Sequence, residues 1–296
     1  MNPGDRLNQE CLVVELCKGH SLLKILISSD MEGITGVTSW DHVDPSRAEY
    51  QRFRHIMTGD VNSAIDGAFA GGAEDVVVTD GHWNGSNILI EELDKRAKLN
   101  SGLGTSQYSM MQGIEGSYSG VFFVGYHARA CSENAILDHT WSTNFNNVWL
   151  NNILVGEYGL NAALAGYFGV PVVMISGDQT ACRQARELLG NLETAEVKYA
   201  SGRHSALCLP PAESQLLIRN ASLKAIDNLR KGLAPKPYVV QSPMQITIDL
   251  ISSDMADRVS RLPGSQRVGN KISFSSPDMD AAYKTFRAAA GLASLS

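Results

Sequence analysis

Four short runs of apolar residues recur along the first two thirds of the chain, and each run is continuous rather than alternating. Continuous runs bounded by polar residues are typical of strands that are buried on both faces of a parallel sheet. We therefore predict strands at Lys24–Ser29, Asp75–Thr79, Gly120–Tyr126 and Pro171–Ser176.

Segments with helical spacing separate or follow these runs. The first of them predicts two helices, with Thr58 as an N-cap between them, and Asp178 is the expected N-cap of the last. Strands that alternate with helices predict an α/β fold, in which helices flank a largely parallel, Rossmann-like sheet as three layers. The helical segments are Pro45–Gly72, Ser106–Gln112, Glu157–Phe168 and Gln179–Leu189.

The pattern changes after about residue 190, where a smaller α+β domain is predicted. Met244–Ile251 alternates between apolar and polar residues, as a half-buried strand does. Earlier in the chain, Asn147–Val155 predicts a hairpin with two asparagines in its turn, because Asn tolerates positive φ. Further strands are expected at Ala195–Ala200 and Lys271–Ser275, and helices at Pro211–Gly232 and Pro277–Leu292.

These patterns divide the chain into three parts. Residues 1–23 are predicted to form an N-terminal extension, residues 24–190 an α/β domain that contains the candidate metal-binding and catalytic residues given below, and residues 191–296 the smaller α+β domain. The extension lacks the basic start and the long apolar core of a secretory signal, so we expect the protein in the cytoplasm.

Composition narrows the function further. The 296 residues are 44% hydrophobic and 19% charged, which is ordinary for a globular protein. A net charge of −6 gives no basic field for nucleic acid or an anionic membrane. No apolar run approaches the roughly 18 residues of a membrane helix. Five cysteines without a CxxC motif favour a reducing compartment, and a metal site at Cys11, Cys17 and His20 is disfavoured because its ligand set is incomplete.

Candidate chemistry lies where three of the predicted strands end. Asp30 and Glu32 follow the first strand, His82 the second and His127 the third. In an open parallel sheet, ligands bind outside the carboxyl ends of the strands. These four side chains should therefore converge on one place.

The residue types indicate a metal site. Asp30 and Glu32 are two apart, so extended backbone would point both carboxylates to one side, where they repel unless a cation lies between them. The histidines complete an O/N ligand set that suits zinc or a similar divalent ion. Glu157 opens a predicted helix and can project toward the same edge. Five such ligands exceed the needs of one tetrahedral zinc and suit two ions that share a bridging carboxylate.

Each residue taken alone has an ordinary alternative. Asp-x-Glu after a strand is usually a turn or cap, and Gly-His a loop. His127 could be a packed histidine, and Glu157 a first-turn Glu favoured by the helix dipole. His139 lacks a neighbouring ligand, so it is either an acid/base or oxyanion donor beside the metals or a packed histidine. The remaining histidines are interpreted as surface or packing residues: His20, His42, His55 and His204.

Four segments resemble, in order, those of the bacterial zinc D-aminopeptidases (peptidase family M55). They are Ser29–Gly36 (SDMEGITG), Thr79–His82 (TDGH), Gly125–Ala130 (GYHARA) and Val155–Ala162 (VGEYGLNA). The similarity extends from about Lys24 to the C-terminus. The chain departs from the family between His127 and His139, where it is slightly longer and has Leu137-Asp138 in place of a small polar residue.

The resemblance implies an activity and an assembly. It implies hydrolysis of N-terminal D-amino acids, such as D-Ala, from short peptides, with two zinc ions per subunit and His139 as the catalytic residue. It also implies stacked rings of subunits that form a decamer. The zinc ligands that it implies are Asp30, which bridges the ions, Glu32, His82, His127 and Glu157.

Two other functions remain open from the sequence. One is a related zinc amidase with a different amide substrate, because residues outside the metal site set specificity. The other is a dipeptide-binding protein that does not turn its ligand over. The rich ligand set argues against the second.

Overall fold

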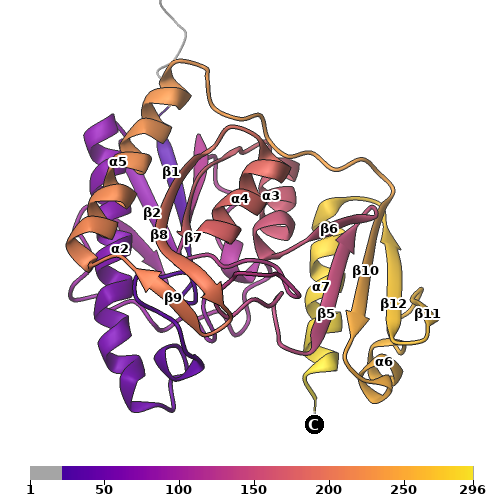
Figure 1. Ribbon diagram of the computed structural model, residues 1–296. Coiled ribbons are helices and arrows are strands. Elements are labelled where there is room, and N and C mark those ends of the chain that lie inside the picture. Colours follow the sequence, from indigo (N-terminus) through magenta and orange to yellow (C-terminus); the bar gives the residue numbers. More distant parts are fainter. Residues whose placement is uncertain (1–21, 296) are drawn as a thin grey trace, which may run out of the picture.

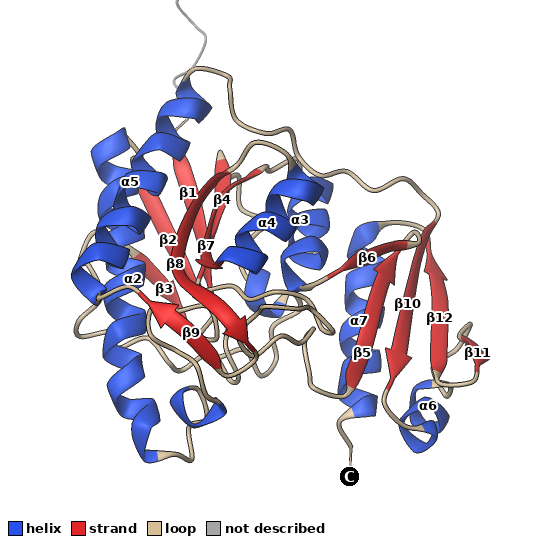
Figure 2. Ribbon diagram, in the orientation of Figure 1, coloured by secondary structure: helices blue, strands red, loops and turns tan. Residues whose placement is uncertain are grey.

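The computed structural model describes residues 22–295 and contains two sheets (Figures 1 and 2). The first sheet has seven strands in the order β3-β2-β1-β4-β7-β8-β9. Its six strands from β3 to β8 pair in parallel, and β9 is antiparallel to β8. The strands are β1 (Lys24–Ser29), β2 (Asp75–Asp80), β3 (Lys98–Asn100), β4 (Gly120–Val124), β7 (Val172–Asp178), β8 (Glu193–Gly202) and β9 (Ser205–Cys208).

Helices cover both faces of this sheet, as Figure 2 shows. Helices α2 (Ala48–Gly71) and α5 (Pro211–Arg230) pack against each other on one face, and α3 (Glu157–Tyr167) and α4 (Gln179–Leu189) lie on the other. Asp178 caps α4 by accepting hydrogen bonds from two backbone N–H groups. The predicted α/β class, with a largely parallel sheet in a three-layer arrangement, is therefore confirmed.

Helix α2 is one continuous helix, so the prediction of two helices was wrong. Thr58 is not an N-cap, because its hydroxyl donates a hydrogen bond to the carbonyl of Arg54, four residues earlier within the same helix. Buried apolar residues such as Phe53, Met57 and Val61 continue at helical spacing through this point. Packing of that apolar face offsets the low helix propensity of one threonine.

The second sheet is antiparallel, with the order β11-β12-β10-β5-β6. Residues Asn151 and Asn152 connect β5 to β6 with φ of 45° and 67°, so the predicted hairpin turn is confirmed. Helix α7 covers one face of this sheet (Figure 1). The elements are β5 (Phe145–Leu150), β6 (Ile153–Val155), β10 (Met244–Leu250), β11 (Gln266–Val268), β12 (Lys271–Ser276), α6 (Ser253–Val259) and α7 (Met279–Ala293).

The two sheets do not separate at residue 190. Strands β8 and β9 and helix α5 follow that residue but belong to the first sheet and its helical layer, whereas the β5–β6 hairpin precedes it and pairs with β10. A local pattern predicts a strand but not the partner of that strand. The proposed domain boundary between residues 24–190 and residues 191–296 stays a prediction.

The short helices differ from the prediction in two places. Ser106–Gln112 holds only the 3-10 helix η2 (Ser109–Met111), and η1 (Trp40–His42) was not predicted. The N-terminal extension before Leu22, with Cys11, Cys17 and His20, lies outside the described residues. Within residues 22–295, no helix is both long and apolar enough to cross a membrane.

Candidate metal centre

The carboxyl ends of three adjacent parallel strands form the floor of the site. Asp30 follows β1, His82 lies two residues after β2, and His127 lies three residues after β4. Glu157 is the first residue of α3, which begins directly behind strand β6. All four side chains are buried, as is that of Glu32. The structure thus brings together the five residues that the sequence singled out as ligands.

Asp30 lies at the centre of this cluster. Its Oδ1 is 3.3 Å from His82 Nδ1, and its Oδ2 is 3.3 Å from His127 Nε2. Glu32 Oε2 lies 3.1 Å from the same His82 nitrogen, and Glu157 Oε1 lies 3.1 Å from the same His127 nitrogen. Asp30 therefore connects two half-sites, one with Glu32 and His82, the other with His127 and Glu157.

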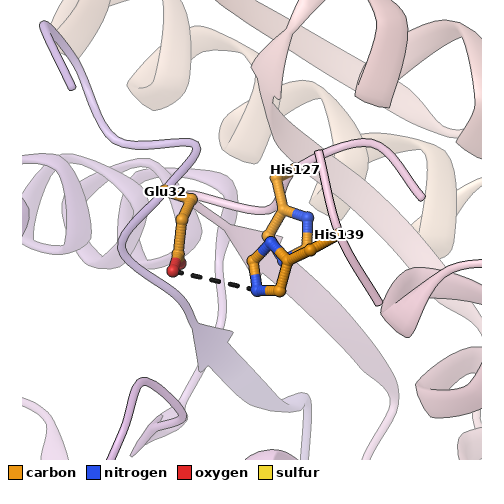
Figure 3. Close-up of side chains that lie close together, drawn as sticks. All are labelled: Glu32, His127 and His139. Carbon is orange, nitrogen blue, oxygen red and sulfur yellow. Dashed lines mark ion pairs between the residues drawn. The ribbon is translucent and has the colours of Figure 1, made fainter. Parts of the chain in front are cut away.

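Each half-site offers three ligand atoms close enough to share one ion. In both groups the ligand atoms lie within 4.8 Å of one another. A third group of the same compactness consists of Glu32, His127 and His139, which Figure 3 shows side by side. His139 is less tightly engaged, since its Nε2 lies 3.9 Å from Glu32 and 3.7 Å from Glu157.

Backbone carbonyls fix the orientation of all three histidines. His82 Nε2 donates to the Val43 carbonyl at 2.9 Å, His127 Nδ1 to Ala128 at 2.9 Å, and His139 Nδ1 to Leu137 at 2.7 Å. A carbonyl can only accept, so these nitrogens carry the protons. In the neutral ring, the lone pair then lies on the nitrogen that faces the carboxylates. Metal-binding histidines are typically held in this way.

Three buried polar atoms in the cluster have no hydrogen-bond partner among the described residues: Asp30 Oδ2, Glu32 Oε2 and His127 Nε2. Buried polar atoms normally have partners, so such a concentration requires an explanation. The distances between them and their neighbours are short, but the directions are not those of hydrogen bonds. Lone pairs that converge in this way fit a divalent cation.

The electrostatics of the cluster also favour a cation. Burial lowers the pKa of His82 and His127, but the nearby carboxylates outweigh burial and raise both pKa values well above the ordinary range. Burial raises the pKa of Asp30, and its contacts with the same histidines outweigh this and lower the pKa. The carboxylates thus require positive charge beside them.

His139 is positioned by a loop of unusual backbone. Leu137 and Trp141 on either side of it have φ of 47° and 67°, which are uncommon for residues other than glycine. The His139 ring stacks on His127, with centroids 3.9 Å apart. Burial and then the charge of His127 lower the pKa of His139, which favours its neutral ring.

A family model described as D-aminopeptidase matches residues 23–288 of this chain. The chain belongs to the D-aminopeptidase family. It is 35% identical over 264 residues to a D-aminopeptidase of Bacillus subtilis. This alignment covers 88% of this chain and 94% of the relative. Its structure is also similar to that of DppA from Bacillus subtilis, described as a Zn-dependent D-aminopeptidase and a self-compartmentalizing protease. That match has a TM-score of 0.89 and 33% identity, and it covers 93% of this chain and 99% of the other.

Membership of the D-aminopeptidase family makes this chain a peptidase, as the resemblance of its four segments implied. The interpretation as a dipeptide-binding protein without turnover is therefore not supported.

Sequence reasoning missed Lys198, a residue that supports the site. Its side chain is fully buried, and Nζ donates to the carbonyls of Glu32, Ile34 and Val37 at 2.6, 2.9 and 2.8 Å. These bonds fix the loop that carries Glu32. No local signal marks Lys198, because it lies in an unremarkable strand far away in the sequence.

Two further supports were missed as well. Asp80 ends β2 and accepts hydrogen bonds from the backbone N–H groups of Asn87 and Ile88, which shapes the loop around His82. Gly33 lies so close to the 125–126 backbone that a Cβ would fall 1.9 Å from the Tyr126 carbonyl oxygen. The first glycine of the SDMEGITG motif, Gly33, was the signal in the sequence for this close approach of two backbone segments.

The cluster of candidate metal ligands opens into a cleft of about 890 Å³. Asp30, Glu32, His82, His139 and Glu157 all line it, whereas His127 lies beneath them. His42, His55 and His204 do not line it. His42 stacks on Phe53 and His55 pairs with Glu92, in agreement with their interpretation as packing or surface residues.

Proposed function

We propose that the protein is a di-zinc aminopeptidase that releases N-terminal D-amino acids, such as D-Ala, from short peptides. The observation that carries this proposal is the pair of ligand groups that share Asp30. The similarity to an enzyme described as a Zn-dependent D-aminopeptidase supports both the metal and the substrate class.

The proposed ligands divide between two ions. Glu32 and His82 would hold one ion and His127 and Glu157 the other, with Asp30 shared between the two half-sites. When bound, zinc supplies Lewis-acid chemistry that lowers the pKa of a water molecule and polarises the scissile carbonyl. A hydrogen bond from the Trp141 N–H to Oε1 of Glu157, at 2.6 Å, fixes the orientation of this carboxylate.

His139 is proposed as the catalytic residue rather than a ligand. Its neutral ring holds a proton on Nδ1, so Nε2 is free to accept a proton from the attacking water and deliver it to the leaving amine. It lies farther from the carboxylates than the other two histidines do. The carboxylates of the cleft can bind the free α-amine of the substrate, which would favour aminopeptidase over endopeptidase action.

We also propose that the chain assembles into rings that form a decamer. The description of the relative as a self-compartmentalizing protease supports an assembly of this kind. Light scattering of the purified protein would give the number of subunits. The cytoplasmic location expected from the sequence stays a prediction.

Replacing Asp30 by alanine tests the proposal, because Asp30 contributes to both half-sites. We expect the wild type to contain about two zinc ions per chain and to hydrolyse D-Ala-D-Ala. Asp30→Ala should lose most of the zinc and at least about 100-fold in kcat/KM. Elemental analysis and a coupled amine assay measure the two quantities.

Asp227→Ala is the matched control, because Asp227 is a partly exposed aspartate on α5 that pairs with Lys231 and with no other cation within residues 22–295. Hydrolysis that persists in metal-free protein would contradict the proposal. Cleavage of other amides in preference to D-aminoacyl peptides would instead favour the related amidase.

A further inference from the structure

Tryptophan is concentrated around the metal-binding cleft. The chain has four tryptophans, and three of them, Trp40, Trp83 and Trp141, line this cleft. The fourth, Trp149, lies on β5 beneath Lys271 and does not line it. Aromatic side chains in a substrate cleft provide large, rigid apolar walls. D-Ala, with one methyl group, would leave most of this apolar surface without a partner.

Each of the three tryptophans lies close to the reacting groups. The ring of Trp83 lies 6.3 Å from that of His82, and the ring of Trp40 lies 5.3 Å from that of His139. Trp141 follows two residues after His139, and its N–H donates to Glu157. A substrate side chain next to the scissile bond would therefore contact these rings.

Trp83 is the least expected of the three. It is 63% exposed, and its φ of 49° is uncommon for a bulky residue. An exposed tryptophan in strained backbone contributes little to folding. Because it lines the cleft, its exposed ring is available to a bound molecule.

One cationic side chain, from the helix that covers the second sheet, also lines the cleft. Arg287 of α7 is the only lysine or arginine among the described residues that line it, and four lining residues are carboxylates. Its guanidinium donates through Nη1 to the Ser106 carbonyl, whereas Nε and Nη2 have no partner within residues 22–295. These two N–H donors of the guanidinium can bind the two oxygens of a carboxylate.

We propose that the cleft selects short peptides with an aromatic side chain beside the scissile bond and a free C-terminal carboxylate. The tryptophans contact the side chain, and Arg287 binds the carboxylate. This proposal rests on the proposed function and names its substrate class more narrowly than D-Ala peptides.

A small peptide panel tests both parts. It contains D-Ala-D-Ala, D-Phe-D-Ala and D-Ala-D-Phe, each as the free acid and as the C-terminal amide. We expect kcat/KM for at least one phenylalanine peptide to exceed that for D-Ala-D-Ala by about tenfold. Each acid should exceed its amide by about tenfold, because an amide leaves the guanidinium without its ionic partner.

Three variants assign these preferences. Trp83→Ala should reduce the ratio between phenylalanine and alanine peptides by about tenfold, and Trp83→Phe should keep most of it. Arg287→Gln should bring acids and amides to similar kcat/KM. Trp149→Phe is the matched control and should leave both ratios unchanged. Circular dichroism and zinc content show whether each variant is folded.

The outcomes separate this inference from the proposed function. If kcat/KM for D-Ala-D-Ala equals or exceeds that for both phenylalanine peptides, the proposed preference for an aromatic side chain is wrong. If wild-type acids and amides react alike, the role of Arg287 is wrong. If no peptide is cleaved, the aminopeptidase proposal fails. Quenching of tryptophan fluorescence by the same peptides then decides the inference, because the three cleft tryptophans report binding directly.

Discussion

At the scale of single residues, the loop before the hairpin is held in place by the side chain of Asp138. The loop carries His139, and Asp138 precedes that histidine directly. Asp138 Oδ1 pairs with Arg203 Nε at 3.0 Å, and Arg203 Nη2 donates to the carbonyl of Asp138 at 2.9 Å. Its other oxygen accepts from the N–H of Ser132 at 3.1 Å. These contacts anchor a backbone that would otherwise relax from its uncommon φ angles.

We predict that Asp138→Ala lowers kcat by about tenfold while zinc content and KM change little. The reason is that Asp138 positions the His139 loop but belongs to neither half-site. Steady-state kinetics and elemental analysis of the same preparation measure these quantities. Asp138→Asn keeps an acceptor for Ser132 and should recover part of kcat. Loss of zinc in Asp138→Ala, or an unchanged kcat, would show that the loop is not held in this way.

At the scale of elements, the loop after β1 is connected to two helices by a buried polar group. Asp60 of α2 accepts hydrogen bonds through Oδ2 from the N–H and hydroxyl of Thr35, at 3.0 and 2.9 Å. The Thr35 hydroxyl also lies 2.8 Å from that of Ser214 on α5. Asp60 Oδ1 has no partner among the described residues. Burial raises the pKa of Asp60 to about 6, and the hydrogen bonds from Thr35 only partly oppose this.

This raised pKa predicts a pH dependence of stability. The folded protein holds the Asp60 proton up to about pH 6, whereas the unfolded chain releases it near 3.9. The contribution of Asp60 is therefore present at low pH and is lost as pH rises through about 6. We expect Asp60→Asn to gain stability relative to the wild type between about pH 4 and 6, by up to ~3 kcal/mol. Above pH 6 the difference should stay constant.

Urea unfolding of both proteins across this pH range measures the difference. Metal loss at acid pH affects both proteins alike, so the comparison isolates Asp60. A difference in the free energy of unfolding that does not change with pH would show that Asp60 has an ordinary pKa in the folded state.

Local signals in the sequence predicted much of the first sheet. The continuous apolar runs of β1, β2, β4 and β7 were visible because strands buried on both faces leave no room for polar residues. The convergence of Asp30, His82 and His127 followed from parallel strands alone. Strands β3 and β9, at the two edges of this sheet, were not predicted, because edge strands have mixed patterns that resemble loops. Strand β8 extends beyond the predicted Ala195–Ala200 at both ends.

Support from distant residues was beyond such reasoning. Lys198 and Arg203 act on loops more than 60 positions earlier in the chain, through hydrogen bonds that no local spacing encodes. Arg287 reaches the cleft from α7 because the β5–β6 hairpin pairs with β10 and so brings the C-terminal half beside the site. Long-range pairing of this kind depends on the whole fold.

At the scale of the whole molecule, one face of the first sheet shares a hydrophobic core with the second sheet. A single cluster of buried residues includes Phe123 of β4 and Ile175 of β7, from the first sheet, and Ile248 of β10 and Phe286 of α7, from the C-terminal half. The chain also crosses between the sheets before and after the hairpin. The cluster of candidate metal ligands depends on this connection, because Glu157 follows strand β6 by only two residues.

Phe286 tests whether the halves unfold as one unit. Its ring packs edge-to-face on Trp141 and Phe145, with centroids 5.2 and 6.1 Å apart. Phe286→Ala should lower the free energy of unfolding by about 3–5 kcal/mol, because it removes a fully buried aromatic side chain. Leu207→Ala, at a position that is 71% exposed, is the matched control and should change stability by less than about 0.5 kcal/mol.

The transition should remain single in the variant. Tryptophan fluorescence reports Trp149 on the second sheet together with the cleft tryptophans, and release of bound zinc reports the strand ends of the first sheet. Because the core is continuous, both probes should shift to lower denaturant together. If one part of the fluorescence change preceded zinc release and the other part coincided with it, the C-terminal half would unfold separately, and the site would not depend on the shared core.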